Sequence, residues 1–98
     1  MKINPETYYI VRGAHSGVFA GNILEQNGRE VKMANVRCLW RWCGAATILQ
    51  LATEGVKNAS GCKFTMVVPE VTILDAIEVV PCTETAKDII MGVPEWKI

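Results

Sequence analysis

The stretch VFAGNILEQNGREVKMANVRCLWRW, residues 18–42, decides the fold of this protein. Its two halves are rich in β-forming residues. Between them stands Asn27-Gly28, the dipeptide most typical of a two-residue type I′ hairpin turn. The sequence therefore predicts two antiparallel strands, residues 18–26 and 29–42. YYIVRG, residues 8–13, precedes them across the turn GAHSG and predicts one more strand, which completes an antiparallel meander.

The remainder of the chain predicts two helices and two further strands. GAATILQLATEGVKN, residues 44–58, has apolar residues at helical spacing, with Gly44 suited to the N-cap and Gly55 to the C-terminal end. CKFTMVV predicts a strand that stops at Pro69, and EVTILDAIEVV, residues 70–80, predicts one continuous strand. TETAKDIIMG predicts a short helix capped by Thr83 and ended by Gly92.

This order predicts a single α+β domain over residues 1–98. We expect a mainly antiparallel sheet, built from the β-meander and two further strands, with a helix packed on one face and a short C-terminal helix. At 98 residues the chain buries only about two thirds of its unfolded surface, so we expect a homo-oligomer to form.

Composition narrows the classes of function. Ten basic and ten acidic residues give a net charge of zero, which argues against non-specific binding of nucleic acid or of a membrane surface. The N-terminus MKINPETYYI has no apolar signal region, and no apolar run approaches the ~20 residues that span a bilayer. We therefore expect a cytoplasmic protein without a membrane partner.

The four cysteines and the single histidine do not predict a metal site or a cofactor. Cys38, Cys43, Cys62 and Cys82 are scattered without a close pair, so we interpret them as reduced thiols. His15 stands alone in a turn beside Ser16, and no residue is placed by the sequence to complete a catalytic group. We therefore expect a binding protein and no enzyme.

Strand alternation separates the side chains of the meander into two faces. A two-residue Asn27-Gly28 loop pairs Gln26 with Arg29, and the first turn pairs Arg12 with Val18. One face is then almost wholly apolar, and we expect the helix after Gly44 to pack over it; it carries Tyr9, Val11, Phe19, Gly21, Ala34, Val36, Cys38, Trp40 and Trp42.

The opposite face of the meander carries three arginines, Arg12, Arg37 and Arg41, with Tyr8 near them. Like charges on adjacent strands cost energy unless a negative charge lies between them. Glu78 or Asp75 could supply that charge within the chain. A bound phosphate or an acidic partner surface is the alternative.

The stretch RCLWRWCGAA, residues 37–46, predicts a second element of a binding site at the junction between strand and helix. Trp42 could line a cleft there, and Gly44, Ala45 and Ala46 leave the amides of a first helical turn uncovered for an anion. Close packing of helix on sheet explains the same small residues equally well. The stretch is neither a Walker A loop nor a G-x-G-x-x-G fingerprint.

The segments YYIVRGAHSGVFAGNI, NGREVKMANVRCLWRWCGAATILQLATEGVKN, CKFTMVV and LDAIEVVPCTETA carry a resemblance. In them the chain resembles a family of short single-domain proteins, of unassigned function, encoded by bacteriophages and prophages. The resemblance covers most of residues 8–96 and brings no known catalytic or binding residue. It implies an accessory protein in the cytoplasm of a host bacterium, where counter-defence is a prominent role.

These observations favour a non-enzymatic counter-defence protein that sequesters a small anionic nucleotide signal. Arginines would bind its phosphates, an aromatic ring would stack on its base, and amides near Gly44 would complete the site. The predicted ligand-binding residues are Tyr8, Arg12, Arg37, Arg41, Trp42, Gly44, Ala45 and Ala46. The alternative is an interaction module that inhibits a host enzyme through the arginine-bearing face.

Overall fold

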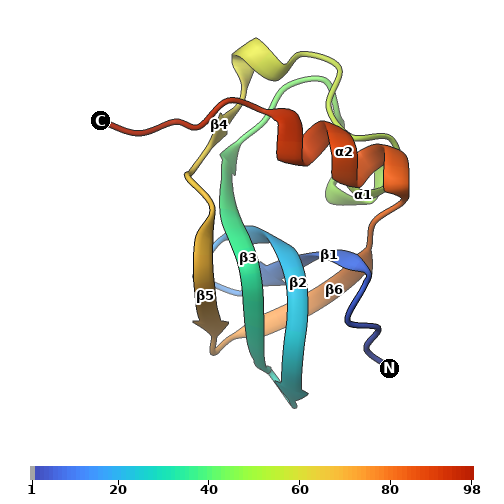
Figure 1. Ribbon diagram of the computed structural model, residues 1–98, viewed down its shortest axis with the longest axis vertical. Helices are drawn as coiled ribbons and strands as arrows, with labels where there is room; N and C mark the ends of the chain where they lie inside the picture. The colour runs from blue at the N-terminus through green and yellow to red at the C-terminus, as the bar shows by residue number, and fades with distance from the viewer. Residues whose placement is uncertain (1) are drawn as a thin grey trace.

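The computed structural model describes residues 2–98, which form an antiparallel sheet of six strands and two α-helices (Figure 1). The strands are β1 (Tyr8–Gly13), β2 (Val18–Asn27), β3 (Glu30–Arg41), β4 (Lys63–Phe64), β5 (Val68–Ile73) and β6 (Ala76–Pro81). The helices are α1 (Ile48–Glu54) and α2 (Glu84–Gly92), with a short 3-10 turn at Ala59–Gly61. The predicted α+β class is therefore confirmed.

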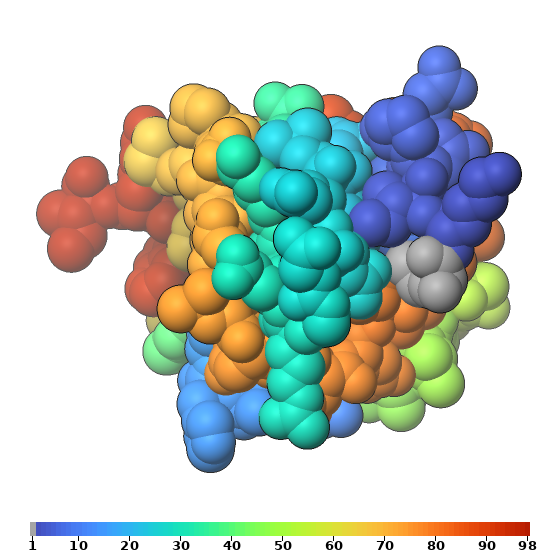
Figure 2. All heavy atoms as spheres, turned by 90° about the horizontal axis from the view of Figure 1, so that it is seen from below, coloured from blue at the N-terminus to red at the C-terminus, as the bar shows by residue number. Residues whose placement is uncertain are grey.

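The sheet curls upon itself because its last two long strands lie on opposite sides of the meander. The strand order is β4-β3-β2-β1-β6, and β5 also pairs with β3. The short turn between β5 and β6 thus carries the chain from the β3 side to the β1 side, and β6 passes behind β3 and β2 in the view of Figure 1. Viewed from below, the β2–β3 hairpin runs across this face beside β5 and β6, and the C-terminal residues project to one side (Figure 2).

Each face of the meander buries its own core. Inside the curl, Tyr9, Val11 and Val36 pack with residues of β2, β3, β5 and β6. On the outer face, Tyr8, Ile10, Ala20 and Leu39 pack against Leu51 and Ala52 of α1 and Ala86 and Ile90 of α2. The prediction that the helix covers the Tyr9–Val11 face is therefore wrong, because the curled sheet covers that face itself. Burial on both faces accounts for the apolar sequence of β1.

The two hairpins of the meander differ in how well the sequence predicts their register. Between β1 and β2, Arg12 pairs with Val18 and Tyr9 with Gly21, as predicted. Between β2 and β3, Asn27 pairs with Glu30, so the turn residues are Gly28 and Arg29. Gly28 alone of these two has a positive φ, 61°, which fits a type II′ turn and excludes the predicted type I′ turn.

Two irregularities shift the β2–β3 register further. Asn22 pairs with Ala34 and Ala20 with Arg37, which leaves an extra residue on β3 opposite Gly21. Asn35 takes φ of 50° at this β-bulge. A second shift lies between Ile23 and Glu25. The predicted pairing of Gln26 with Arg29 would set Gly21 opposite Ala34 and Phe19 opposite Val36, and both of these pairs are therefore wrong.

The later strands also differ from the sequence-based expectation. Pro69 lies inside β5 and does not end a strand, because β5 pairs with β3 through the neighbouring residues Val68 and Glu70. Residues 70–80 form two strands, since the chain turns at Leu74-Asp75, where the carboxylate of Asp75 binds the β1–β2 loop. The C-terminal helix is as predicted: the Thr83 hydroxyl accepts a hydrogen bond from the Ala86 amide at its N-cap.

Candidate functional site

The structure separates the three arginines that the sequence placed on one exposed face. Arg37 is 2 % exposed and lies between the sheet and α2. Its guanidinium donates to four carbonyl oxygens, those of Phe64 (3.3 Å), Thr65 (2.9 Å), Ile90 (3.0 Å) and Val93 (2.9 Å). It also lies 5.5 Å from the centre of the Phe64 ring. Arg37 therefore holds the interior of the fold together and is not available to an external ligand.

Tyr8 shares this interior with Arg37 and is 3 % exposed. Burial raises the pKa of the Tyr8 phenol to about 12, although the nearby charge of Arg37 opposes that rise. Burial also lowers the pKa of Arg37 from its ordinary value. The prediction that Tyr8 and Arg37 line a surface site is corrected, because helices α1 and α2 cover the face on which both residues lie.

Arg12 is paired within the chain. Its Nε atom lies 3.1 Å from a carboxylate oxygen of Glu78, its register partner on β6. This ion pair is the internal counter-charge that the sequence offered as one alternative. Asp75, the other candidate, binds the β1–β2 loop through the Ser16 hydroxyl (2.6 Å) and the His15 amide (2.7 Å).

The junction between β3 and α1 differs from the predicted amide cradle. The first helix begins at Ile48 with Thr47 as its N-cap, so Gly44, Ala45 and Ala46 precede it in an irregular loop. Gly44 has φ of 85°, and a side chain there would collide with the backbone nitrogen of Lys57. The Ala46 amide is bonded to the Gln50 side chain at 2.8 Å. These residues pack the loop, and they do not form the first turn of a helix.

The same end of β3 brings together a different group of side chains, which we call the aromatic platform: Trp40, Trp96, Lys63 and Arg41. The rings of Trp40 and Trp96 stack with their centres 5.0 Å apart. The ammonium of Lys63 lies 5.6 Å from the centre of the Trp40 ring and 5.3 Å from that of Trp96. Trp40 is nevertheless 60 % exposed and Trp96 44 % exposed, so both rings remain open to a ligand.

The backbone fixes the position of the C-terminal tail in the platform. The Trp96 amide donates to the carbonyl oxygen of Phe64 at 2.8 Å, and Phe64 forms a parallel bridge with Glu95. The tail at Glu95 and Trp96 is thus held against Phe64 of β4, and β4 in turn pairs with the end of β3. Trp42 lies nearby in sequence but packs, partly buried, against the outer core.

The platform carries positive charge that the chain does not neutralise. Arg41 is the register partner of Lys63 across the β3–β4 ladder. Within residues 2–98, neither residue forms an ion pair with a carboxylate. Glu95, the acidic residue of the tail, pairs with Lys97 at 3.6 Å. A lysine ammonium beside two exposed indole rings, with Arg41 paired to that lysine across the ladder, is chemically suited to an anionic ligand with an aromatic group.

Strand alternation in the sequence placed Trp40 on the apolar face of the meander, where a core position was expected. In the structure, Trp40 lies at a register shift between Leu39 and Arg41 on the β3–β4 ladder, is exposed, and is not part of the inner core. Residues 40, 63 and 96 are brought together only by the return of the chain through β4 and the tail. The signal available in the sequence was that Trp40 lies between basic residues at the end of a strand.

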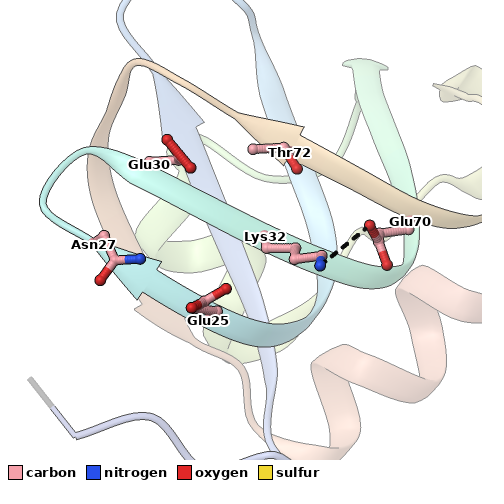
Figure 3. A pocket seen from close by; sticks show the side chains of 6 residues that line it. All are labelled: Glu25, Asn27, Glu30, Lys32, Glu70 and Thr72. Atoms are coloured by element: carbon pink, nitrogen blue, oxygen red, sulfur yellow. Dashed lines mark ion pairs between the residues drawn. The ribbon is translucent and has the colours of Figure 1, made fainter.

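A surface depression of about 240 Å³ lies over β2, β3 and β5 (Figure 3). It is lined by Glu25, Asn27, Glu30, Lys32, Glu70 and Thr72, and Lys32 pairs with Glu70 at 3.7 Å. Three carboxylates against one ammonium give this depression the wrong sign for an anion. Within the part of the chain that the structure describes, no cluster of three or more acidic, histidine or cysteine side chains is arranged to hold a metal ion.

A second depression of about 400 Å³ lies between the β1–β2 loop and the β5–β6 turn. Its lining is mainly apolar and includes Phe19, Val71 and Leu74, with His15 and Ser16 at its edge. The Ser16 hydroxyl donates to Asp75, so it is bonded to a carboxylate and not to the imidazole of its neighbour.

Among the described residues, no helix has both the length and the apolar character needed to cross a membrane.

The chain belongs to the family described as domain of unknown function DUF6948, whose model matches residues 6–90. No curated protein and no solved structure matches the chain significantly. The match covers all six strands, α1, α2 up to Ile90, and three of the four platform residues. Trp96 lies beyond the matched range.

Proposed function

We propose that this protein is a non-catalytic binding protein that takes a small anionic nucleotide at the aromatic platform. The observation that carries the proposal is the stack of Trp40 on Trp96, which is solvent-exposed and has the Lys63 ammonium beside both rings. A nucleobase would stack on the open surface of Trp40. Its phosphates would bind Lys63 and Arg41, which have no carboxylate partner among residues 2–98.

The proposal keeps the ligand class that the sequence suggested and moves the site. In the proposed site, Trp40 replaces Tyr8 and Trp42 as the aromatic residue that stacks on the base. Lys63 replaces Arg12 and Arg37 as a cation that binds the phosphates. Of the cations first considered, Arg41 remains. We also propose that the protein forms a homo-oligomer. The platform is an open surface, and a second chain could cover the exposed side of a nucleotide bound there.

The biological setting is part of the same proposal. The segments that resemble phage and prophage proteins support a role as an accessory protein acting in the cytoplasm of a bacterial host. Sequestration of a nucleotide immune signal would be its counter-defence activity. The second candidate is inhibition of a host enzyme, with Trp40, Trp96 and Arg41 as the contact residues, since Trp and Arg are enriched among the residues that dominate protein interfaces.

A thermal-shift screen tests nucleotide binding. The panel contains cyclic dinucleotides, cyclic trinucleotides and ADP-ribose-type compounds. A ligand at 100 times its Kd stabilises the folded state by about 2.7 kcal/mol, which raises Tm by roughly 10–20 °C in a domain of this size. A panel without any shift rejects the nucleotide proposal, and recovery of a stoichiometric host protein by pull-down would then favour the second candidate.

Matched variants locate the site. Stacking of one base on an aromatic side chain contributes about 1–3 kcal/mol, so Trp40→Ala should weaken binding roughly 10-fold or more. Lys63→Ala should weaken it as well, and more strongly at low salt. Leu24→Ala and Lys57→Ala change exposed residues of the same kinds elsewhere and should leave the affinity unchanged. Equal losses in all four variants would place the ligand elsewhere.

A further inference from the structure

Two of the four cysteines meet at the base of the aromatic platform. Cys43 follows the end of β3 and Cys62 precedes β4, 19 positions apart in the sequence. The amide nitrogen of Cys43 lies 3.5 Å from the sulfur of Cys62, and that sulfur lies 3.9 Å from the Cys43 carbonyl oxygen. The Cys62 thiol is therefore packed directly against the backbone of Cys43.

The side chain of Cys43 points toward the same place. Its thiol donates to the carbonyl oxygen of Gly61 at 3.4 Å. A methyl group on Gly61 would come within 2.8 Å of the Cys43 sulfur, so this sulfur lies against the residue that immediately precedes Cys62. Both thiols are partly exposed. Each donates to backbone carbonyl groups, and the Cys62 sulfur also accepts from the Cys43 amide; these contacts do not prevent rotation about the side-chain torsions.

We propose that Cys43 and Cys62 form a reversible disulfide bond when the protein meets a peroxide. A disulfide requires the two Cβ atoms to lie about 3.5–4.5 Å apart, so the two segments must already be neighbours. The Cys62 sulfur lies against the backbone of Cys43, and the Cys43 sulfur lies against the backbone of Gly61, next to Cys62. The proposal does not depend on nucleotide binding. It assigns a redox modification site to the junction of β3 and β4.

The chemistry balances with hydrogen peroxide as the oxidant. The thiolate of one cysteine attacks a peroxide oxygen, the O–O bond breaks, and a sulfenic acid forms with release of one water. The second thiol attacks that sulfur and displaces a second water as the S–S bond forms. The two thiols together lose two protons and two electrons, and the peroxide is reduced to two waters.

The other two cysteines provide an internal comparison. Burial raises the pKa of the Cys38 thiol, and it raises that of Cys82 to about 12, so both stay protonated at neutral pH. Among the described residues, no hydrogen bond joins Cys38 or Cys82 to another cysteine, whereas Cys43 and Cys62 are joined by the contacts of the Cys62 sulfur with the Cys43 backbone. Cys38→Ser and Cys82→Ser are therefore matched controls.

The bond would close a loop that contains α1 and the Ala59–Gly61 turn. Cross-linking the ends of such a loop stabilises the folded chain mainly by restricting the unfolded chain. It would also fix the spacing between residues 41 and 63, which flank the two cysteines and contribute to the platform. Oxidation should raise Tm by several degrees, and dithiothreitol should reverse the rise.

The test uses the full chain treated with dilute hydrogen peroxide and then with N-ethylmaleimide, followed by intact-mass analysis and peptide mapping. The wild type and the Cys38→Ser, Cys82→Ser variants should lose two alkylatable thiols and yield one peptide linked through Cys43 and Cys62. Cys62→Ser keeps a hydroxyl donor at that position. It should yield no linked peptide and should retain a sulfenic acid at Cys43 that a dimedone probe labels.

Three results would overturn the proposal. The first is full alkylation of both thiols after oxidation of the wild type, and the second is a linked peptide that joins any other pair. The third is an intermolecular dimer through Cys43 in place of the internal bond, which non-reducing electrophoresis would reveal. Circular dichroism of Cys62→Ser, compared with the wild type, ensures that a lost cross-link reflects lost chemistry and not an unfolded chain.

Discussion

Arg37 on β3 donates a hydrogen bond of 3.0 Å to the carbonyl oxygen of Ile90, in the last turn of α2. The same guanidinium nitrogen donates to the Val93 carbonyl at 2.9 Å. Carbonyl groups at the end of a helix lack partners within the helix, and the helix dipole places negative partial charge there. A buried cation from the sheet thus terminates the helix, and one side chain connects the outer face of the sheet to α2.

Arg37→Met should destabilise the protein more than any surface substitution. Methionine retains most of the apolar stem but leaves the Thr65 and Val93 carbonyl oxygens without the donor that Arg37 supplies. The Phe64 and Ile90 carbonyl oxygens lose one donor and keep a bond from a backbone amide. Because an unsatisfied buried polar group costs about 1–3 kcal/mol, we expect a loss of about 3 kcal/mol or more in the free energy of unfolding. Urea denaturation monitored by circular dichroism gives this value.

Arg12→Met is the matched control for Arg37→Met. Arg12 is bonded to Glu78, but both side chains are substantially exposed, at 48 % and 33 %. Exposed ion pairs contribute about 0–1 kcal/mol, so this variant should unfold close to the wild type. Equal losses in the two variants would show that the carbonyl contacts of Arg37 do not carry the stability assigned to them.

Asp75→Asn should lower stability and flatten its dependence on acid pH. The hydrogen bond from the Ser16 hydroxyl, followed by those from the amides of the β1–β2 loop, lowers the pKa of the Asp75 carboxyl below its ordinary value of 3.8. A lowered folded-state pKa contributes stability that is present above the ordinary pKa and is lost as pH falls through the folded-state value. The wild type should therefore lose this contribution below about pH 4, as urea titrations between pH 7 and pH 3 would show.

The Asp75→Asn variant should show a shallower slope of unfolding free energy over the same pH range. Asp88→Asn, which changes an exposed carboxylate of α2, should keep the wild-type slope. Identical slopes for the wild type and Asp75→Asn would mean that the Asp75 carboxylate does not hold the β1–β2 loop in solution.

Tyr8 should make the protein sensitive to alkali. Burial raises its pKa from 10.0 to about 12, so the folded state retains the phenolic proton more tightly than the unfolded state. The resulting stability is complete below pH 10 and is lost as pH rises from 10 to 12, with an upper limit of about 2–3 kcal/mol. In Tyr9→Phe, Tyr8 is the single remaining tyrosine, so the absorbance of tyrosinate reports its ionisation directly.

Ionisation of Tyr8 in Tyr9→Phe should have its midpoint near pH 12 or coincide with unfolding. An ordinary titration centred near pH 10 in a chain that is still folded would contradict the buried position of Tyr8. Tyr8→Phe should remove the loss of stability between pH 10 and 12. It should leave the contribution of Cys82, whose pKa burial raises from 9.0 to about 12 and whose loss therefore starts at lower pH.

Sequence patterns predicted the elements of this fold better than their mutual packing. The strand alternation of β1 and β2 and the capping of α2 by Thr83 follow from local residue preferences, and the structure confirms them. Apolar residues on both faces of β1 indicated burial but not which face the helices cover. The face that the helices cover depends on the curl of the sheet. The curl arises at the Leu74-Asp75 turn, where Asp75 contacts His15, 60 positions away in the sequence.

The candidate site was less predictable for the same reason. Arg37 resembles any surface arginine in sequence, and only the return of the chain through β4 and α2 supplies the carbonyl groups that allow its burial. The aromatic platform likewise depends on a contact between Trp40 and Trp96, in segments joined by no local pattern. The position of the predicted strand–helix site at the end of β3 is the same end at which the platform lies.

Gly21→Ala tests the bulge that sets the register of β3. A Cβ atom at Gly21 would lie 2.8 Å from the Ala34 carbonyl oxygen and 3.0 Å from the Val36 Cα, both backbone atoms that cannot rotate away. The bulge at Asn35 requires this close approach of the two strands. We expect the methyl group to force the strands apart at a cost of about 1–3 kcal/mol, measured by urea denaturation.

Gly92→Ala is the control for Gly21→Ala, because an added Cβ at Gly92 would meet nothing within 4 Å. Gly92 is the last residue of α2, where alanine should be neutral or stabilise by up to about 1 kcal/mol. A Gly21→Ala protein as stable as the wild type would show that β2 and β3 do not approach closely at residue 35. The side chains of β3 beyond the bulge, from Val36 to Trp40, would then have no fixed assignment to the inner or outer face.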